Sequence, residues 1–183
     1  MTIAVRLTEV EAYGGSDDPG SHAFRGRTER NATMFGPPGH LYCYLSYGMH
    51  RLLNIVCQEP GDPAAVLLRA GEVVTGREAA RARRTRRRGG GVTDRELARG
   101  PGCLGQVFAA SAATDGAPLA VPEAPAGWSF TLPAEPVEYV AGPRVGVSGA
   151  GGDPDAFPWR YSIPGDATVS RFVPGRNVTK AGL

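Results

Sequence analysis

Apolar and polar residues alternate over residues 3–13, and this alternation predicts a β-strand. A period of two places six side chains on one face of the strand: Ile3, Val5, Leu7, Glu9, Glu11 and Tyr13. This face is apolar at its start and becomes acidic at Glu9. Either the sheet reaches water there, or a carboxylate is held inside the protein.

The pattern predicts five more strands, at residues 40–49, 52–58, 64–73, 139–149 and 159–165. Helical spacing is expected at residues 76–84, and one or two short helices at residues 94–112. Residues 14–39 form a long polar connection, which is typical of a segment that is functional or folds back over another part of the chain. Six arginines lie within residues 81–88 and three glycines follow, so we expect residues 81–91 to form a mobile, solvated loop.

Composition limits the class of protein. A chain of 183 residues with 42% hydrophobic content suits one domain with its own core. No run of 18 apolar residues is present, and the N-terminus lacks the pattern of a signal peptide. Three widely separated cysteines and three histidines match no metal spacing or disulfide framework. We therefore expect a cytoplasmic protein with no metal or cofactor and no membrane partner.

Charge is unevenly distributed along the chain. The net charge is +2, but residues 1–110 carry 15 arginines against 11 acidic residues, whereas residues 111–183 carry five basic and seven acidic residues. All basic residues except Lys180 are arginines. A GC-rich genome explains such a bias. The many arginines also supply guanidinium groups, whose planar fork of N–H donors suits phosphate groups.

Glu11 has two readings from the pattern alone. It is a carboxylate at a strand end, solvated or paired with an arginine, or it is a general base held among apolar neighbours. Arg69 follows Leu67 and Leu68 in a strand that should be mostly buried, so its guanidinium needs a carboxylate partner. Arg69 is the natural cation for Glu11.

The aromatic segment LYCYLSYGMH also has two readings. Tyr42 and Tyr44 share a strand face and are typical of core or cross-strand pairs. Tyr47, beside Gly48 at an apparent bend, is instead suited to stacking on a nucleic-acid base. Asn54 lies among leucine and isoleucine, where its amide must find a partner or discriminate a ligand.

Several motifs then occur in one order: TEVEAY, SHAFRGRTERN, MFGPPGHLYCYLSYGMH, LN, AVLLRA, RGPGCLGQ and PRVGV. Together they resemble the alkyladenine (3-methyladenine) DNA glycosylase family over nearly the whole chain. The resemblance implies a single α+β domain over residues 1–183, with a curved, mainly antiparallel β-sheet and surrounding helices. It implies a monomer that binds duplex DNA with damaged purines at the bacterial nucleoid.

The resemblance also assigns site residues. Glu11 matches the base that activates water, Arg69 the arginine that helps to hold this water, and the main-chain carbonyl of Val145 a third contact to it. The side chains expected to sandwich the flipped base are Tyr13, His22 and Tyr44, and Asn54 matches the amide that screens purines. Tyr47 matches the wedge in the duplex, in the minor groove, and Met49 its neighbour.

The implied reaction is hydrolysis of the N-glycosidic bond of 3-methyladenine, 7-methylguanine or hypoxanthine, which starts base excision repair. A base must leave the stack before it can be reached, and alkylation gives the purine a positive charge that suits aromatic faces. Glycosylases that also cut the strand use an amine nucleophile. One lysine, near the C-terminus, therefore favours water and a monofunctional enzyme.

The chain departs from the family at its start. Family members carry a helix with an L-L-G signature and a strand before TEVEAY, whereas MTIAVRL alone precedes it here. We expect the usual N-terminal segment to be missing, either genuinely or through a start codon assigned too late. Two alternatives remain: an inactive relative that binds lesions without cutting, and a nucleoside or sugar hydrolase whose second acid is Asp17 or Asp18.

Overall fold

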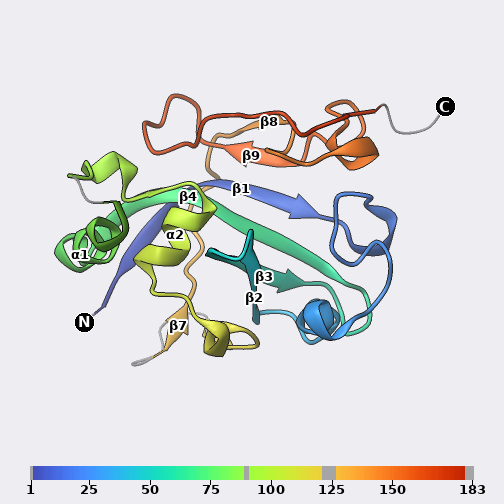
Figure 1. Cartoon of the computed structure of the whole chain (residues 1–183), viewed down its shortest axis with the longest axis horizontal. Coiled ribbons are helices and arrows are strands. Elements are labelled where there is room, and N and C mark those ends of the chain that lie inside the picture. The colour runs from blue at the N-terminus through green and yellow to red at the C-terminus, as the bar shows by residue number, and fades with distance from the viewer. Residues whose placement is uncertain (1, 89–90, 121–126, 180–183) are drawn as a thin grey trace.

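The computed structural model describes residues 2–88, 91–120 and 127–179. A seven-stranded sheet runs through the molecule in the order β2-β3-β4-β1-β9-β8, with β5 beside β4 (Figure 1). Its strands are β1 (Ala4–Tyr13), β2 (Leu41–Ser46), β3 (His50–Cys57), β4 (Ala64–Thr75), β5 (Ala98–Arg99), β8 (Val140–Gly142) and β9 (Arg160–Ser162). Every pairing between these strands is antiparallel. The predicted α+β class with a mainly antiparallel sheet is confirmed.

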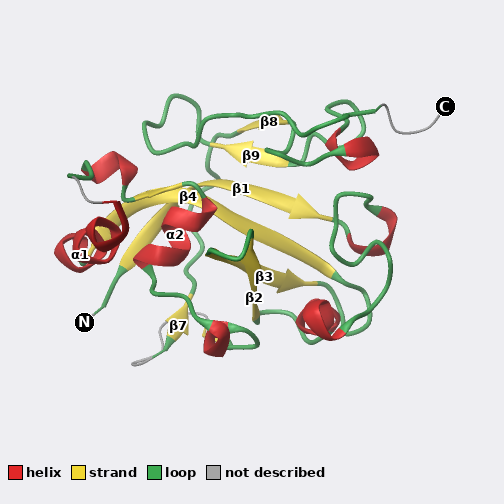
Figure 2. Ribbon diagram, in the orientation of Figure 1, coloured by secondary structure: helices red, strands yellow, loops and turns green. Residues whose placement is uncertain are grey.

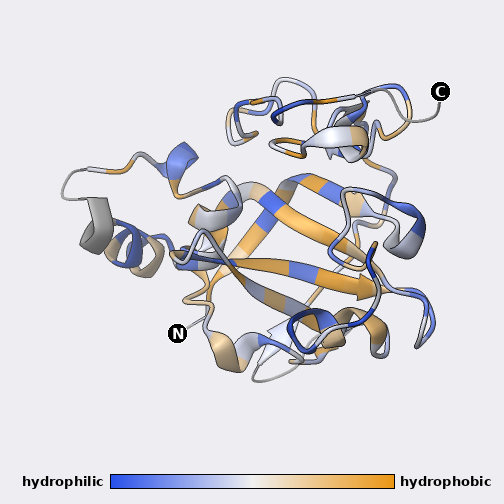
Figure 3. Ribbon diagram, turned by 45° about the vertical axis from the view of Figure 1, so that its right-hand side comes forward, coloured by the Kyte–Doolittle hydropathy of each residue, from blue (hydrophilic) through white to orange (hydrophobic). Residues whose placement is uncertain are grey.

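α2 (Pro101–Val107) lies against one face of the sheet, and α1 (Arg77–Arg88) packs beside α2 at the end of β4 (Figure 2). Their apolar side chains join those of the strands in a core that includes Leu53, Val73, Leu97 and Leu104. Figure 3 shows the hydrophobic colour concentrated on the central strands and the hydrophilic colour on the connections around them. The small sheet of β6 (Leu119–Ala120) and β7 (Trp128–Ser129) is parallel.

The prediction of a loop from residue 81 is wrong, because α1 continues to Arg88. Arginine is a good helix former, and the described arginines of α1 find acceptors on neighbouring segments. Arg84 Nη1 donates to Gln106 Oε1 at 2.6 Å, and Arg83 donates to the carbonyl of Val107. These contacts hold α1 against α2. Residues 89–90 of the expected loop lie outside the described residues.

The long connection after β1 folds back over one end of the sheet, as its length predicted. It contains short 3-10 helices at Gly15–Asp17 and Glu29–Phe35. Ala23 and Met34 from this connection are buried and pack with side chains of β2, β3 and β4 in a second core cluster. The connection therefore forms a wall beside the ends of these strands.

The C-terminal part of the chain forms the β9–β8 edge of the sheet, at the other side from β2. β9 pairs with β1 through residues Glu9, Val10 and Glu11. The segment after β9 returns to β1, where the hydroxyls of Thr8 and Thr168 lie 2.8 Å apart. Across the described parts of the chain, no helix is both long enough and apolar enough to cross a membrane.

Candidate active site

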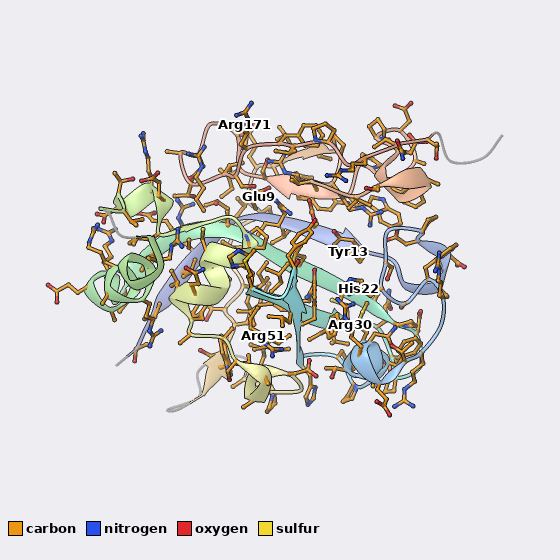
Figure 4. All side chains as sticks on the ribbon, viewed as in Figure 1. Glu9, Tyr13, His22, Arg30, Arg51 and Arg171 are labelled. Atoms are coloured by element: carbon orange, nitrogen blue, oxygen red, sulfur yellow. The ribbon has the colours of Figure 1, made fainter. Side chains whose placement is uncertain are left out.

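A cavity of about 640 Å³ opens where β1, β2, β3 and β4 meet the connection after β1. Its size falls within the range of small-ligand pockets, roughly 300–1,000 Å³. Residues from seven parts of the chain line it, among them Tyr13, His22, Tyr44, Asn54, Arg69 and Val145. The labelled side chains of Tyr13, His22 and Arg30 can be followed along this side of the molecule in Figure 4.

Glu11 lies behind the cavity wall rather than on its surface. Its side chain is fully buried. Tyr13 donates its hydroxyl to Oε2 at 2.9 Å, the amide of Val145 donates to Oε1 at 2.6 Å, and Arg69 Nη1 lies 3.2 Å from Oε2. Each of these three partners lines the cavity. The prediction that Arg69 partners Glu11 is therefore confirmed as a contact.

A second carboxylate, Glu9, shares the same guanidinium. Arg69 Nε donates to Glu9 Oε1 at 2.8 Å, and Arg160 Nε donates to the same oxygen at 2.6 Å. Burial alone would raise the pKa of Glu9, but Arg69, Arg160 and Ser170 together bring this pKa below its ordinary value. Burial disfavours the charged form of Arg69, yet Glu11 and Glu9 raise the pKa of its guanidinium above its ordinary value. Both shifts favour the charged forms, so Glu9 and Arg69 form an ionised carboxylate–guanidinium pair at neutral pH.

Three aromatic rings form one side of the cavity. Tyr42 and Tyr44 stack with ring centroids 5.4 Å apart, and the ring of His22 meets Tyr44 edge-on at 4.5 Å. His22 Nδ1 lies 3.0 Å from the hydroxyl of Tyr42. Burial raises the pKa of Tyr44 to about 12 and that of Tyr13 well above its ordinary value. Both phenols are therefore neutral donors at pH 7.

Asn54 is buried on β3 and faces the cavity. Its Nδ2 donates to the carbonyl of Tyr42 at 3.1 Å, which fixes the orientation of the amide. An amide held in this way presents its polar edge to a ligand in one defined orientation.

Tyr47 projects from the turn between β2 and β3. Tyr47 and Gly48 have φ values of 49° and 67°, and the amide of Met49 donates to the carbonyl of Ser46 at 3.0 Å. Two consecutive positive φ values are the mark of a type I′ turn, which suits a hairpin. The side chain of Tyr47 is 90% exposed and that of Met49 is 61% exposed. An apolar pair therefore stands in solvent at the cavity rim, to which Tyr47 belongs.

A buried ion pair behind Tyr13 was not predicted. Arg144 donates to both oxygens of Asp18, at 2.5 and 2.7 Å, and to the carbonyls of Ala12 and Gly151. Neither side chain of the pair has exposed surface. The guanidinium carbon of Arg144 lies 4.6 Å from the centroid of the Tyr13 ring. The pair therefore joins β1, the connection after it and the segment that carries Val145.

The structure brings together most of the residues that the sequence singled out. Tyr13, His22, Tyr44, Tyr47, Asn54, Arg69 and Val145 line one cavity, and Glu11 lies directly behind it. Met49 is at the neighbouring turn. The alternative that Asp18 is a second catalytic acid is wrong, because Arg144 and the amides of Gly14 and Gly20 occupy its carboxylate.

We expect His22 to titrate below pH 6.5, because burial and then the Arg30 cation lower its pKa. Between the lowered folded value and the ordinary value near 6.5, the unfolded chain binds the proton more tightly. The contribution of His22 to stability is therefore present above this window and falls as the pH drops through it. Arg30→Met should move the midpoint upward, whereas Arg27→Met, at an exposed arginine nearby, should leave it unchanged. An NMR titration of the ring protons measures both, and a wild-type midpoint above 6.5 would refute the assignment.

Comparison with known proteins bears on this geometry. Residues 1–167 match the model of the family described as Methylpurine-DNA glycosylase. A relative from Leifsonia xyli subsp. xyli is 52% identical over 171 residues, covering 93% of this chain and 78% of the relative. Relatives from Streptomyces avermitilis and Cutibacterium acnes are each 49% identical, covering 93% and 92% of this chain and 77% and 85% of their own lengths. All three carry the name "Putative 3-methyladenine DNA glycosylase".

Proposed function

Because the chain belongs to the methylpurine-DNA glycosylase family, a group of hydrolases of N-glycosyl bonds in DNA, we propose that it releases 3-methyladenine, 7-methylguanine and hypoxanthine with a water molecule activated by Glu11. The observation that carries this proposal is the convergence of Tyr13, Arg69 and the Val145 amide on one buried carboxylate at the cavity wall.

Glu11 has capacity for one more hydrogen bond. A carboxylate accepts about four, and three donors from the described residues reach Glu11. A water molecule hydrogen-bonded to Glu11 gives its proton to the carboxylate as its oxygen attacks C1′ of the deoxyribose. The glycosidic bond breaks, and its electron pair leaves with the base. Arg69 stabilises the carboxylate before the attack and holds the water, as the family resemblance implies.

The water reaches Glu11 when the Tyr13 hydroxyl moves. Glu11 has no exposed surface while all three donors are in place. The Val145 donor is a main-chain amide, and Arg69 is held by Glu9 as well. Among the described residues, the Tyr13 hydroxyl has no second hydrogen-bonding partner; its ring lies against Arg144 and lines the cavity. Stacking of a purine on the Tyr13 ring therefore supplies the contact that turns its hydroxyl away.

The aromatic rings around the cavity suit an alkylated purine. Tyr13, His22 and Tyr44 present π faces and edges from three parts of the chain. A purine methylated at N3 or N7 is cationic, so it binds to such faces, and it leaves as a neutral base. Hypoxanthine leaves only when a ring nitrogen is protonated or strongly hydrogen-bonded. Asn54 then screens the purine edge by the orientation of its amide.

Tyr47→Ala should weaken binding to lesion-containing duplex while leaving the fold intact. Base stacking on an aromatic ring contributes about 1–3 kcal/mol, so we expect a loss of affinity of roughly 5- to 150-fold. The side chain is 90% exposed, and substitutions at such positions change stability by about 0.5 kcal/mol or less. Fluorescence anisotropy measures the affinity and thermal denaturation the stability.

The matched control is Tyr139→Ala, at a tyrosine that is 62% exposed and lies outside the cavity lining. This variant should bind the lesion duplex like the wild type. Equal affinities for Tyr47→Ala and the wild type would exclude a wedge at this turn.

Base release from labelled duplexes tests the proposed function. Duplexes that carry hypoxanthine, 3-methyladenine or 7-methylguanine should lose the free base and retain an abasic site without strand cleavage. Binding without release would indicate a lesion-recognition module instead. Release from free nucleosides but not from duplex DNA would indicate a nucleoside hydrolase.

A further inference from the structure

We propose that Glu9 is a positioning residue for base release, which fixes the guanidinium of Arg69 against Glu11. This inference rests on the proposed function, because it assigns Arg69 a part in the hydrolysis. It adds a second carboxylate that acts through Arg69 and contacts neither water nor substrate.

Arg69 is held in a closed ring of hydrogen bonds. Its Nε donates to Glu9 Oε1 at 2.8 Å, and its Nη2 donates to Ser170 Oγ at 3.2 Å. Ser170 Oγ in turn donates to Glu9 Oε1 at 2.9 Å. Two of the three guanidinium nitrogens, Nε and Nη2, therefore bond to Glu9 and Ser170. Nη1 is left facing Glu11 Oε2 at 3.2 Å.

Glu9 itself is anchored from three segments of the chain. The amide of Ser170 donates to its Oε2 at 2.7 Å, and Arg160 Nε donates to its Oε1 at 2.6 Å. The side chain has no exposed surface, and Arg160 is fixed further by the carbonyl of Ser170 at 3.0 Å. A carboxylate with four donors and no solvent contact is a rigid support for the group that it binds.

The backbone of β1 places both carboxylates beside one arginine. Pairing between β1 and β4 shifts between Leu7 and Glu9 and again between Glu9 and Val10. Thr8 and Glu9, which are consecutive, are both buried as a result. Irregularities of this kind re-aim side chains near functional sites. Here the irregularity brings Glu9 onto the Nε side of Arg69, while Glu11 meets Nη1.

Charge explains why Arg69 needs a second anchor. If Glu11 were its sole carboxylate partner, the guanidinium of Arg69 would form a bidentate pair with Glu11, since bidentate pairing is favoured. That contact would take the hydrogen-bonding site that water requires. Glu9 binds Nε and so prevents it. Loss of Glu9 should therefore slow the chemical step without weakening lesion binding.

Glu9→Gln tests the proposal, with single-turnover base release, lesion-duplex affinity and thermal denaturation measured on the full chain. We expect the single-turnover rate to fall by about 10- to 100-fold, the range expected from misplacement of a catalytic group, with the affinity unchanged. Ser170→Ala opens the hydrogen-bonded ring without removing a charge, so it should also lower the single-turnover rate, by a smaller factor. If Glu9→Gln does not fold, Ser170→Ala tests the proposal in its place. Glu72→Gln, at a surface carboxylate paired with Arg6 and Arg77, is the control and should match the wild type.

A double-mutant cycle separates positioning from a structural role. If Glu9 acts through the guanidinium of Arg69, adding Glu9→Gln to an Arg69→Lys background should lower the rate little further. Lysine has no guanidinium for Glu9 to orient. An equal rate loss in both backgrounds would overturn the proposal. So would a Glu9→Gln rate equal to that of the wild type, or a loss confined to affinity or melting temperature.

The controls separate this inference from the proposed function. An active wild type, an inactive Glu11→Gln and an unaffected Glu9→Gln would overturn the role of Glu9 alone. A wild-type chain that releases no base would overturn both.

Discussion

Glu11→Gln is expected to lower the single-turnover rate of base release by about 10²–10⁴-fold, the range contributed by a positioned general base. Glutamine keeps the length and shape of the side chain but does not accept the proton of water. The aromatic rings, Asn54 and Tyr47 are unchanged, so affinity for the lesion duplex should remain close to that of the wild type. Rates and affinities measured on the same duplex separate the two effects.

Glu11→Gln is also expected to lower the free energy of unfolding. The three groups that approach Glu11 from Tyr13, Arg69 and Val145 are all donors. The NH₂ group of glutamine therefore faces a donor in either orientation, which costs about 1–3 kcal/mol. Rates should be compared well below the melting temperature of the variant. A folded Glu11→Gln that releases base at the wild-type rate would refute Glu11 as the base.

Arg144→Met is expected to have the largest effect on stability, about 3–5 kcal/mol, the cost of removing one partner of a buried ion pair. Asp18 would keep the amides of Gly14 and Gly20 but would lose both of its charged hydrogen bonds. The carbonyls of Ala12 and Gly151 would lose their donor as well. Urea denaturation measures the difference in the free energy of unfolding.

Arg6→Met is the matched control, because Arg6 also pairs with two carboxylates but its side chain is 48% exposed. Exposed pairs of this kind contribute about 0–1 kcal/mol. If the free energy of unfolding falls by a similar, small amount in both variants, the Arg144–Asp18 pair does not hold the segments around Tyr13 together.

The sequence predicted the four long strands β1 to β4, because their apolar residues alternate or form continuous runs. The strands predicted at residues 139–149 and 159–165 are shorter, three residues each, and β5 lies within a segment predicted to be helical. The sequence also predicted the Glu11–Arg69 contact, since an arginine in a buried strand needs a carboxylate. The second carboxylate of that arginine, Glu9, was not predicted. Strict alternation carries no sign of the register shifts on either side of Glu9, and Ser170 and Arg160 lie more than a hundred residues from Glu9 along the chain.

Other features depend on contacts that a local pattern does not contain. Arg144 and Asp18 are separated by 126 positions, and each lies in a polar connection. The arginine run of α1 was read as a loop because its charges suggested solvation, whereas acceptors on the α2 segment hold the helix in place. The carbonyl of Val145 was expected near the water, and it is the amide of this residue that contacts Glu11. A signal for Arg144 existed in PRVGV, where a charged residue precedes an apolar run.

The structure of Glu11→Gln bound to a duplex that contains hypoxanthine is the most direct test of the central claim. We expect the base in the cavity against Tyr13, His22 and Tyr44, the Tyr47 ring in the gap that it leaves, and an ordered water between residue 11, Arg69 and C1′ of the deoxyribose. A base that remains stacked in the duplex, or one bound with its C1′ turned away from residue 11, would contradict it.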